Sequence, residues 1–175
     1  TIGDGAFSNT GLTSVVIPDS VITLNPGIFG TTLTTVTIGS PSIGDGAFAG
    51  LSSLNSVTMT STVTSIGDGA FFNTGLTSVV IPDSVISIGD SAFNGTGLTS
   101  LTIPDSVTTI GNAAFSGTSL SEVIIMVSEE VSNYPDFSSS FDDGVIFTYL
   151  SSDILADNLP NQIVWNQDGA EMALI

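Results

Sequence analysis

The chain has 175 residues, 17 acidic side chains and no Lys, Arg or His, so its formal net charge is −17. Binding to nucleic acids or to anionic membrane surfaces requires cationic side chains, and this composition therefore excludes both as partners. No apolar run approaches the roughly 18 residues of a membrane-spanning helix, so we expect no membrane insertion. The acidic side chains of such a chain repel one another, and salt shortens the range of this repulsion to about 10 Å. We therefore expect a saline, calcium-containing environment outside the cell.

A short unit is repeated in series over residues 1–125. The hexapeptide Ile-Gly-Asp-Gly-Ala-Phe or an altered form of it begins at Ile2, Leu24, Ile43, Ile66, Ile88 and Ile110. These starts lie 22, 19, 23, 22 and 22 residues apart, a period typical of leucine-rich solenoids. The chain begins inside a unit, as expected of a fragment or a processed chain.

Each unit is predicted to supply one short strand and one corner. A Leu-x-x-Val-x-Ile pattern follows the Phe, as in Leu76, Val79 and Ile81, and its alternating apolar residues share one face of a strand. Three strands end at Ile-Pro-Asp-Ser, because Pro lacks an N–H donor and Asp favours a turn. In the following Gly-Asp-x-Ala-Phe corner, Gly permits an unusual backbone angle, Asp is expected to cap a single helical turn, and Phe enters the core.

The repeated residues resemble the BspA-like leucine-rich repeats, also called the Treponema pallidum type, with the consensus I-G-x-x-A-F-x-x-x-x-L-x-x-V-x-I-P-x-S-V. The resemblance covers residues 1–125 as about five to six repeats of about 22 residues. It implies a leucine-rich-repeat solenoid, a β-rich fold of the α/β superhelix class. A curved parallel sheet would form the concave face, with short strands and single helical turns on the convex side. Family members commonly carry Cys between Phe and Leu, where this chain has segments such as Asn-Thr-Gly at 9–11.

The acidic segment 126–175 loses the period and is predicted to be a degenerate repeat followed by a C-terminal cap, because solenoids need an atypical terminal unit to cover the open core. It contains a strand-like run at 145–150, a short helical pattern at 152–159 and a last apolar run at 163–165. Trp165 is expected to pack under the cap. Alternatively, the segment links to a further domain or docks onto another copy of the chain.

Catalysis is not expected from this composition. Without His, Cys, Lys or Arg there is no side chain that ordinarily titrates near neutrality, no thiol nucleophile and no cationic clamp. Paired carboxylates can hydrolyse glycosides, but these Asp residues recur with the period, as structural caps do. We therefore predict a protein that is not an enzyme and needs no cofactor.

One column of acidic residues is a weak candidate for binding Ca²⁺. Asp45, Asp68 and Asp90 occupy equivalent corners, which stack about 5 Å apart in a solenoid, and carboxylate oxygens suit this cation. The simpler interpretation is that these exposed caps stay solvated, since Asn112 interrupts the column and no calcium-loop spacing occurs.

The outward-facing residues of the strands are the candidate binding surface. They form two columns of mostly small, uncharged side chains: Ser14, Thr35, Ser56, Ser78, Ser100 and Glu122, and Val16, Thr37, Thr58, Val80, Thr102 and Ile124. This face lacks the Trp, Tyr and Arg that anchor tight interfaces, and β-branched residues also simply suit strands. Contact with a protein or polysaccharide surface, or with copies of the same chain, remains open. A Thr and Ser array that matches ice is a remote alternative, because ice is flat and the expected sheet is curved.

Function follows from the resemblance, which implies an extracellular or cell-surface module for adhesion or recognition. The alternative is a structural subunit of a surface layer or filament that assembles through its solenoid ends. Asn94, in the sequon Asn-Gly-Thr, is a candidate for glycosylation.

Overall fold

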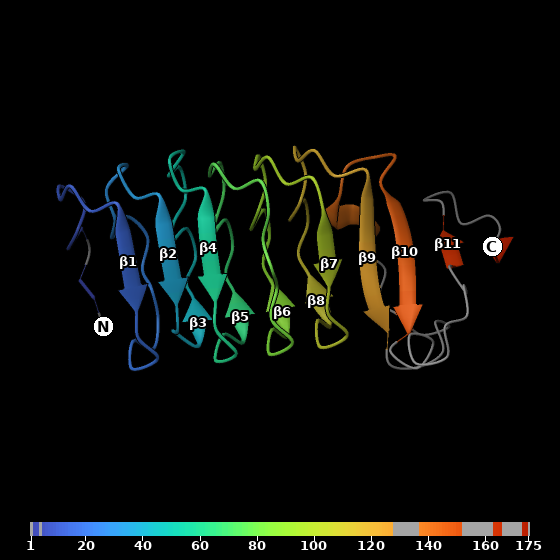
Figure 1. The fold of residues 1–175 in the computed structure, drawn as a ribbon, viewed down its shortest axis with the longest axis horizontal. Coiled ribbons are helices and arrows are strands. Elements are labelled where there is room, and N and C mark those ends of the chain that lie inside the picture. The colour runs from blue at the N-terminus through green and yellow to red at the C-terminus, as the bar shows by residue number, and fades with distance from the viewer. Residues whose placement is uncertain (1, 4, 128–136, 152–162, 166–172, 175) are drawn as a thin grey trace.

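The computed structural model describes residues 2–3, 5–127, 137–151, 163–165 and 173–174. The chain forms a parallel solenoid whose coils stack along the long axis of the molecule (Figure 1). The predicted fold class is confirmed, because each repeat supplies one coil and equivalent residues of successive coils lie in register. Ser14 aligns with Thr35, and Thr35 aligns with Ser56.

Two rows of strands run along the solenoid. The larger row contains β1 (Ser14–Ile17), β2 (Thr35–Ile38), β4 (Ser56–Met59), β7 (Leu101–Ile103), β9 (Glu122–Val127) and β10 (Ile146–Ser151). The second row is the sheet of two-residue strands β3 (Ser42–Ile43), β5 (Ser65–Ile66), β6 (Ser87–Ile88) and β8 (Thr109–Ile110). We call the outward side of the larger row the strand face.

The core between the two rows contains a continuous stack of phenylalanine rings. Phe48, Phe71, Phe93 and Phe115 are 0% exposed, and neighbouring rings among them lie 5.1–5.3 Å apart between centroids. The rings are nearly parallel, and their spacing corresponds to one ring in each coil. The stack continues to Phe141 at 4.9 Å, so residues beyond the last hexapeptide also contribute to the core.

The corners differ from the predicted helical turns. Successive N–H to C=O bonds span three residues, as from Ala47 to Gly44, and the only helix among the described residues is the short 3-10 helix η2 (Ser138–Ser140). A left-handed residue occupies the fourth position of each hexapeptide, so the turn cannot continue as a helix. Gly46 has φ 60°, and even Ala113 at the same position has φ 52°.

The larger row of strands is interrupted at residues 78–81. This segment follows the repeat pattern, but no ladder joins it to β4 or β7. Where the row is continuous, the residue after the strand donates its N–H to the previous coil: Gly39 to Ile17 O and Thr60 to Ile38 O. Pro82, directly after the interrupted segment, and Pro104, directly after β7 in the next coil, occupy the same position and have no N–H to donate to the previous coil.

Replacing Pro82 with Thr is expected to extend the ladder towards β4, because Thr60 makes this bond with a length of 2.9 Å. One hydrogen bond adds about 0.5–1.5 kcal/mol, whereas loss of Pro makes the unfolded chain freer by about 0.4–1 kcal/mol. Global stability should therefore change little, and hydrogen exchange is the informative measurement. We expect the new amide at position 82 to be as protected as that of Thr60; exchange at the rate of an open turn would contradict this explanation.

The C-terminal strands extend the larger row. The predicted strand at 145–150 corresponds to β10, which pairs in parallel with β9, and β11 (Ile163–Trp165) and β12 (Ala173–Leu174) follow in antiparallel order. The predicted helical pattern at 152–159 and the side chain of Trp165 lie outside the described residues. The division at residue 125 into repeats and cap stays a prediction.

Candidate functional site

The strand face presents the two predicted columns of outward-facing residues. The side chains of Ser14, Ser56, Thr58, Ser78, Ser100, Thr102 and Glu122 are exposed, and those of Thr35 and Thr37 are half-buried. Val16 and Val80, at equivalent positions of two coils, are 73% and 80% exposed. The sequence therefore predicts the orientation of these side chains correctly, while their role in binding stays a prediction.

A groove hollows the strand face beside the interrupted strand. Its volume is about 590 Å³, and we call it the strand-face groove. Its walls include residues 78–81, Thr102 and Ile124. Four of the predicted site residues line it, namely Ser78, Ser100, Thr102 and Glu122; the other five, Ser14, Thr35, Ser56, Thr37 and Thr58, lie outside it.

The strand-face groove combines apolar and acidic groups. Val80, Ile124 and Met126 supply apolar surface, and Asp83 and Glu122 supply carboxylates. The carboxylate of Glu122 also accepts a hydrogen bond from the hydroxyl of Thr148 on β10, which holds it at the strand face. The sequence reasoning missed Met126 because it ended the last repeat at residue 125, whereas β9 continues to Val127.

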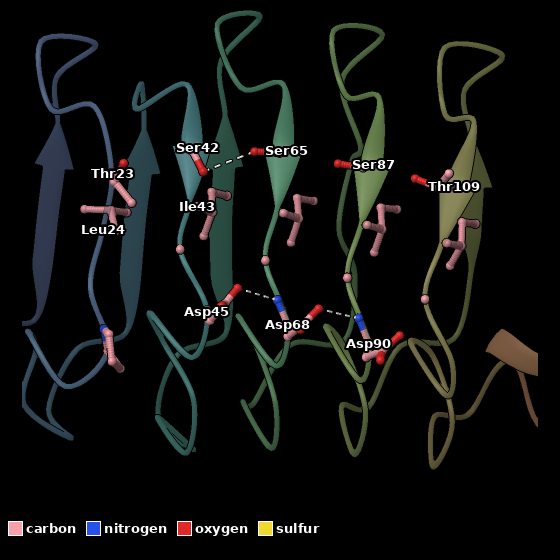
Figure 2. A pocket seen from close by; sticks show the side chains of 18 of the residues that line it. Thr23, Leu24, Ser42, Ile43, Asp45, Ser65, Asp68, Ser87, Asp90 and Thr109 are labelled. Atoms are coloured by element: carbon pink, nitrogen blue, oxygen red, sulfur yellow. Dashed lines mark hydrogen bonds between the residues drawn. The ribbon is translucent and has the colours of Figure 1, made fainter.

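A second groove crosses the sheet of two-residue strands (Figure 2). Its volume is about 840 Å³, and we call it the corner groove. Ser and Thr hydroxyls lie along one side, and the corner Asp carboxylates lie along the other. The sequence analysis did not select the hydroxyl row, although the residue before each hexapeptide in the groove is always Ser or Thr: Thr23, Ser42, Ser65, Ser87 and Thr109.

The corner Asp residues form a ladder between coils. Asp45 Oδ1 accepts the backbone N–H of Asp68 at 3.0 Å, and Asp68 Oδ1 accepts that of Asp90 at 2.8 Å. The last step runs from Asp90 Oδ1 to the N–H of Asn112, at 2.7 Å. The expectation that these Asp residues cap their own turns was wrong, because each carboxylate instead satisfies a donor of the next coil.

The ladder uses the carboxylates of Asp45, Asp68 and Asp90, which are the weak candidates for binding Ca²⁺. One oxygen of each carboxylate already accepts an N–H, and this bond competes with its use as one of the several oxygen ligands that Ca²⁺ needs. Among the residues that the structure describes, no group of three or more acidic side chains is arranged to hold a metal ion. Calcium binding stays an untested prediction.

Two substitutions of Asp68 separate its hydrogen bond from its charge. Asp68→Ala removes the acceptor for the Asp90 N–H and should lower the melting temperature by a few degrees. Asp68→Asn keeps an oxygen acceptor and relieves like-charge repulsion, so its melting temperature should equal or exceed that of the parent. Circular dichroism melts at low salt measure both; equal losses in the two variants would contradict the ladder.

The glycosylation candidate Asn94 is half-buried, and its Nδ2 donates a hydrogen bond to Ala113 O at 3.4 Å. A glycan on Nδ2 would leave one N–H there, so this contact does not by itself prevent modification. Glycosylation at Asn94 stays a prediction. None of the helices in the described part of the chain is long and apolar enough to cross a membrane.

Comparisons with known proteins place the chain among repeat proteins. The family model described as BspA type leucine rich repeat region matches residues 1–41 and 31–141 in six copies. A search of the curated proteins gives no match.

Several solved structures have a similar fold. A leucine-rich repeat protein from Bacteroides ovatus has 26% identity, a TM-score of 0.63 and coverage of 85% of this chain. The T. pallidum leucine rich repeat protein has 26% identity, a TM-score of 0.59 and 65% coverage. A leucine rich cell surface protein from Faecalibacterium prausnitzii has 35% identity, a TM-score of 0.52 and 70% coverage. The alignments cover 45%, 59% and 42% of those three proteins, so this chain corresponds to about half of such a molecule.

Proposed function

Because the chain belongs to the BspA-type leucine-rich repeat family, we propose that it is a non-enzymatic, extracellular or cell-surface module that recognises a partner protein through the strand-face groove. The similar protein from Faecalibacterium prausnitzii is described as a cell surface protein, which supports this location. The composition agrees with a role in recognition, since it offers no His, thiol or cationic side chain for catalysis near neutral pH.

The observation that carries the proposal is that the groove forms over only part of the strand face, beside the interrupted strand, with apolar and acidic side chains in its walls. At one outward position, the second, third and fifth coils have Thr37, Thr58 and Thr102, whereas the first, fourth and sixth have Val16, Val80 and Ile124. Val80, Thr102 and Ile124 line the groove, and Val16, Thr37 and Thr58 do not. Residues shared by all copies build the coil, so a surface specific to a few coils is where one partner can be distinguished from another.

The groove favours a partner of defined chemistry. Apolar side chains of the partner would be buried against Val80, Ile124 and Met126, and cationic side chains would face Asp83 and Glu122. The chain has no cation of its own to neutralise these carboxylates. We therefore expect an apolar segment flanked by Lys or Arg, with binding that weakens as salt is raised.

A binding survey tests the proposed function. The purified chain, labelled with a fluorophore, is titrated over wells coated with individual matrix proteins and cell-surface glycoproteins, and negative-stain microscopy records its assembly state. Saturable binding to at least one protein, by dispersed molecules, is the expected result. Absence of saturable binding would contradict the proposal, and ordered fibres in the same sample would then favour the structural subunit of a surface layer or filament.

A further inference from the structure

We propose that the corner groove binds a linear β-1,4-linked polymer of amino sugars, with one sugar residue on each coil. This site lies on the sheet of two-residue strands, and its lining shares no residue with that of the strand-face groove. The inference therefore adds a second ligand to the proposed recognition module.

The first argument is the direction and length of the groove. Its lining includes the Ile-Gly or Leu-Asn step of five successive coils, from Leu24 to Ile110, so it runs along the solenoid axis and across the strands. A ligand that fills it must be extended and parallel to that axis. This geometry favours a linear polymer over a compact small molecule.

The second argument is the spacing of the coils. The phenylalanine rings of the four coils from Phe48 to Phe115 measure this spacing directly, at 5.1–5.3 Å. One β-1,4-linked pyranose residue lengthens an extended chain by nearly the same distance. Each sugar residue of such a polymer would therefore lie on one coil, and every second residue would meet the same protein groups, without accumulating a mismatch along the groove.

The third argument is the pair of polar rows (Figure 2). Ser42 and Ser65 hydroxyls bond each other at 3.1 Å, whereas those of Ser87 and Thr109 make no hydrogen bond within the described part of the chain. Successive residues of a β-1,4 chain turn opposite edges outward. A groove with hydrogen-bonding groups along both sides can satisfy either edge of such a chain.

The fourth argument is charge complementarity, which selects amino sugars. Asp45, Asp68 and Asp90 supply one carboxylate per coil, and the ladder uses only Oδ1 of each. No other hydrogen bond is formed by these carboxylates within the described residues, so Oδ2 is available to an ammonium group of the ligand. Because successive sugar residues turn opposite edges outward, every second ammonium of such a polymer would face the carboxylate row, at twice the coil spacing, whereas an anionic polymer would be repelled.

Calorimetric titration with β-1,4-linked glucosamine oligomers, at a pH where their amines are protonated, tests the site. Affinity should increase from the trimer to the pentamer and then level off, because the groove spans five coils. N-Acetylglucosamine and glucose oligomers of the same linkage and length should bind more weakly. Equal binding of these neutral oligomers would overturn the assignment to amino sugars, and absence of glucosamine binding would overturn the site.

Matched variants separate the groove from general charge attraction. Asp68→Asn with Asp90→Asn keeps oxygen acceptors for the ladder and should weaken pentamer binding about fivefold or more. Asp19→Asn with Asp105→Asn removes the same charge from turns outside the groove and should change binding less than twofold. Equal losses in both pairs, or equally tight binding of a lysine pentapeptide, would contradict a built site. Either result would leave the survey of protein partners unaffected, since that survey concerns the strand-face groove.

Discussion

Phe71→Ala is expected to lower the free energy of unfolding by about 3–5 kcal/mol, the range for removing a fully buried Phe side chain. Phe71 is 0% exposed, and its ring stacks between Phe48 and Phe93 at centroid distances of 5.3 and 5.1 Å. Those two rings are held by their own coils, so they cannot close the cavity that the substitution leaves. The loss of stability therefore combines lost apolar burial, the loss of two stacking contacts and the cost of an unfilled cavity.

Urea unfolding followed by circular dichroism measures this loss, and the adjacent residue provides the control. Phe72 has the same chemistry but is 38% exposed and lies outside the stack, so Phe72→Ala should reduce stability by well under half as much. Similar losses in the two variants would show that position in the ring stack does not determine stability.

Gly67→Ala is the second substitution expected to have a large effect, with a loss of about 1–3 kcal/mol or more from overpacking. A Cβ at this position would lie 2.5 Å from Asp45 Oδ1 and 2.7 Å from Asp45 N. Both atoms belong to the neighbouring coil, and this Oδ1 accepts the N–H of Asp68. The extra methyl must therefore push two coils apart or displace the carboxylate from the ladder.

Gly3→Ala is the matched control for this prediction. Gly3 occupies the same position of the hexapeptide, but a Cβ there would have no atom within 4 Å. Thermal and urea unfolding should show that Gly3→Ala has almost no effect, whereas Gly67→Ala lowers both the midpoint and the melting temperature. A tolerated Gly67→Ala would mean that this Gly is not required by the close approach of the coils.

The sequence predicts the coil because its core residues recur at one period. The spacing of Phe48, Phe71 and Phe93 is enough to place one ring per coil, and the alternation around Val36 and Val57 is enough to orient the strands. These are repetitive contacts between identical positions. Finding the unit in the sequence therefore also identifies its neighbours in the structure.

The details that the sequence analysis missed depend on contacts between coils. An Asp that caps its own turn and one that reaches the next coil satisfy the same kind of N–H, so the letters around Asp68 do not distinguish them. Pro82 was interpreted as the end of a strand, but it also removes a donor that the previous coil needs, and the larger row is interrupted there. Similarly, the sequence analysis did not select Ser87, because only the second sheet places its hydroxyl in the corner groove.

The residues of the chain fall into two groups, a structural scaffold and a proposed binding surface. The residues shared by the repeats form the ring stack, the close corners and the Asp ladder. Outward side chains beside the interrupted strand form the strand-face groove, whose apolar lining includes Val80, Ile124 and Met126. Recognition of a partner protein is proposed to depend on that groove.

The most direct test is to compare Val80→Glu with Val16→Glu in binding to a partner protein identified by the survey. The two Val residues occupy the same position of the repeat and are 80% and 73% exposed, but only Val80 lines the strand-face groove. Each variant gains one negative charge without loss of a buried side chain. We expect Val80→Glu to weaken binding about tenfold or more and Val16→Glu to stay within about twofold of the parent. Equal affinities in the two variants would contradict recognition through this groove.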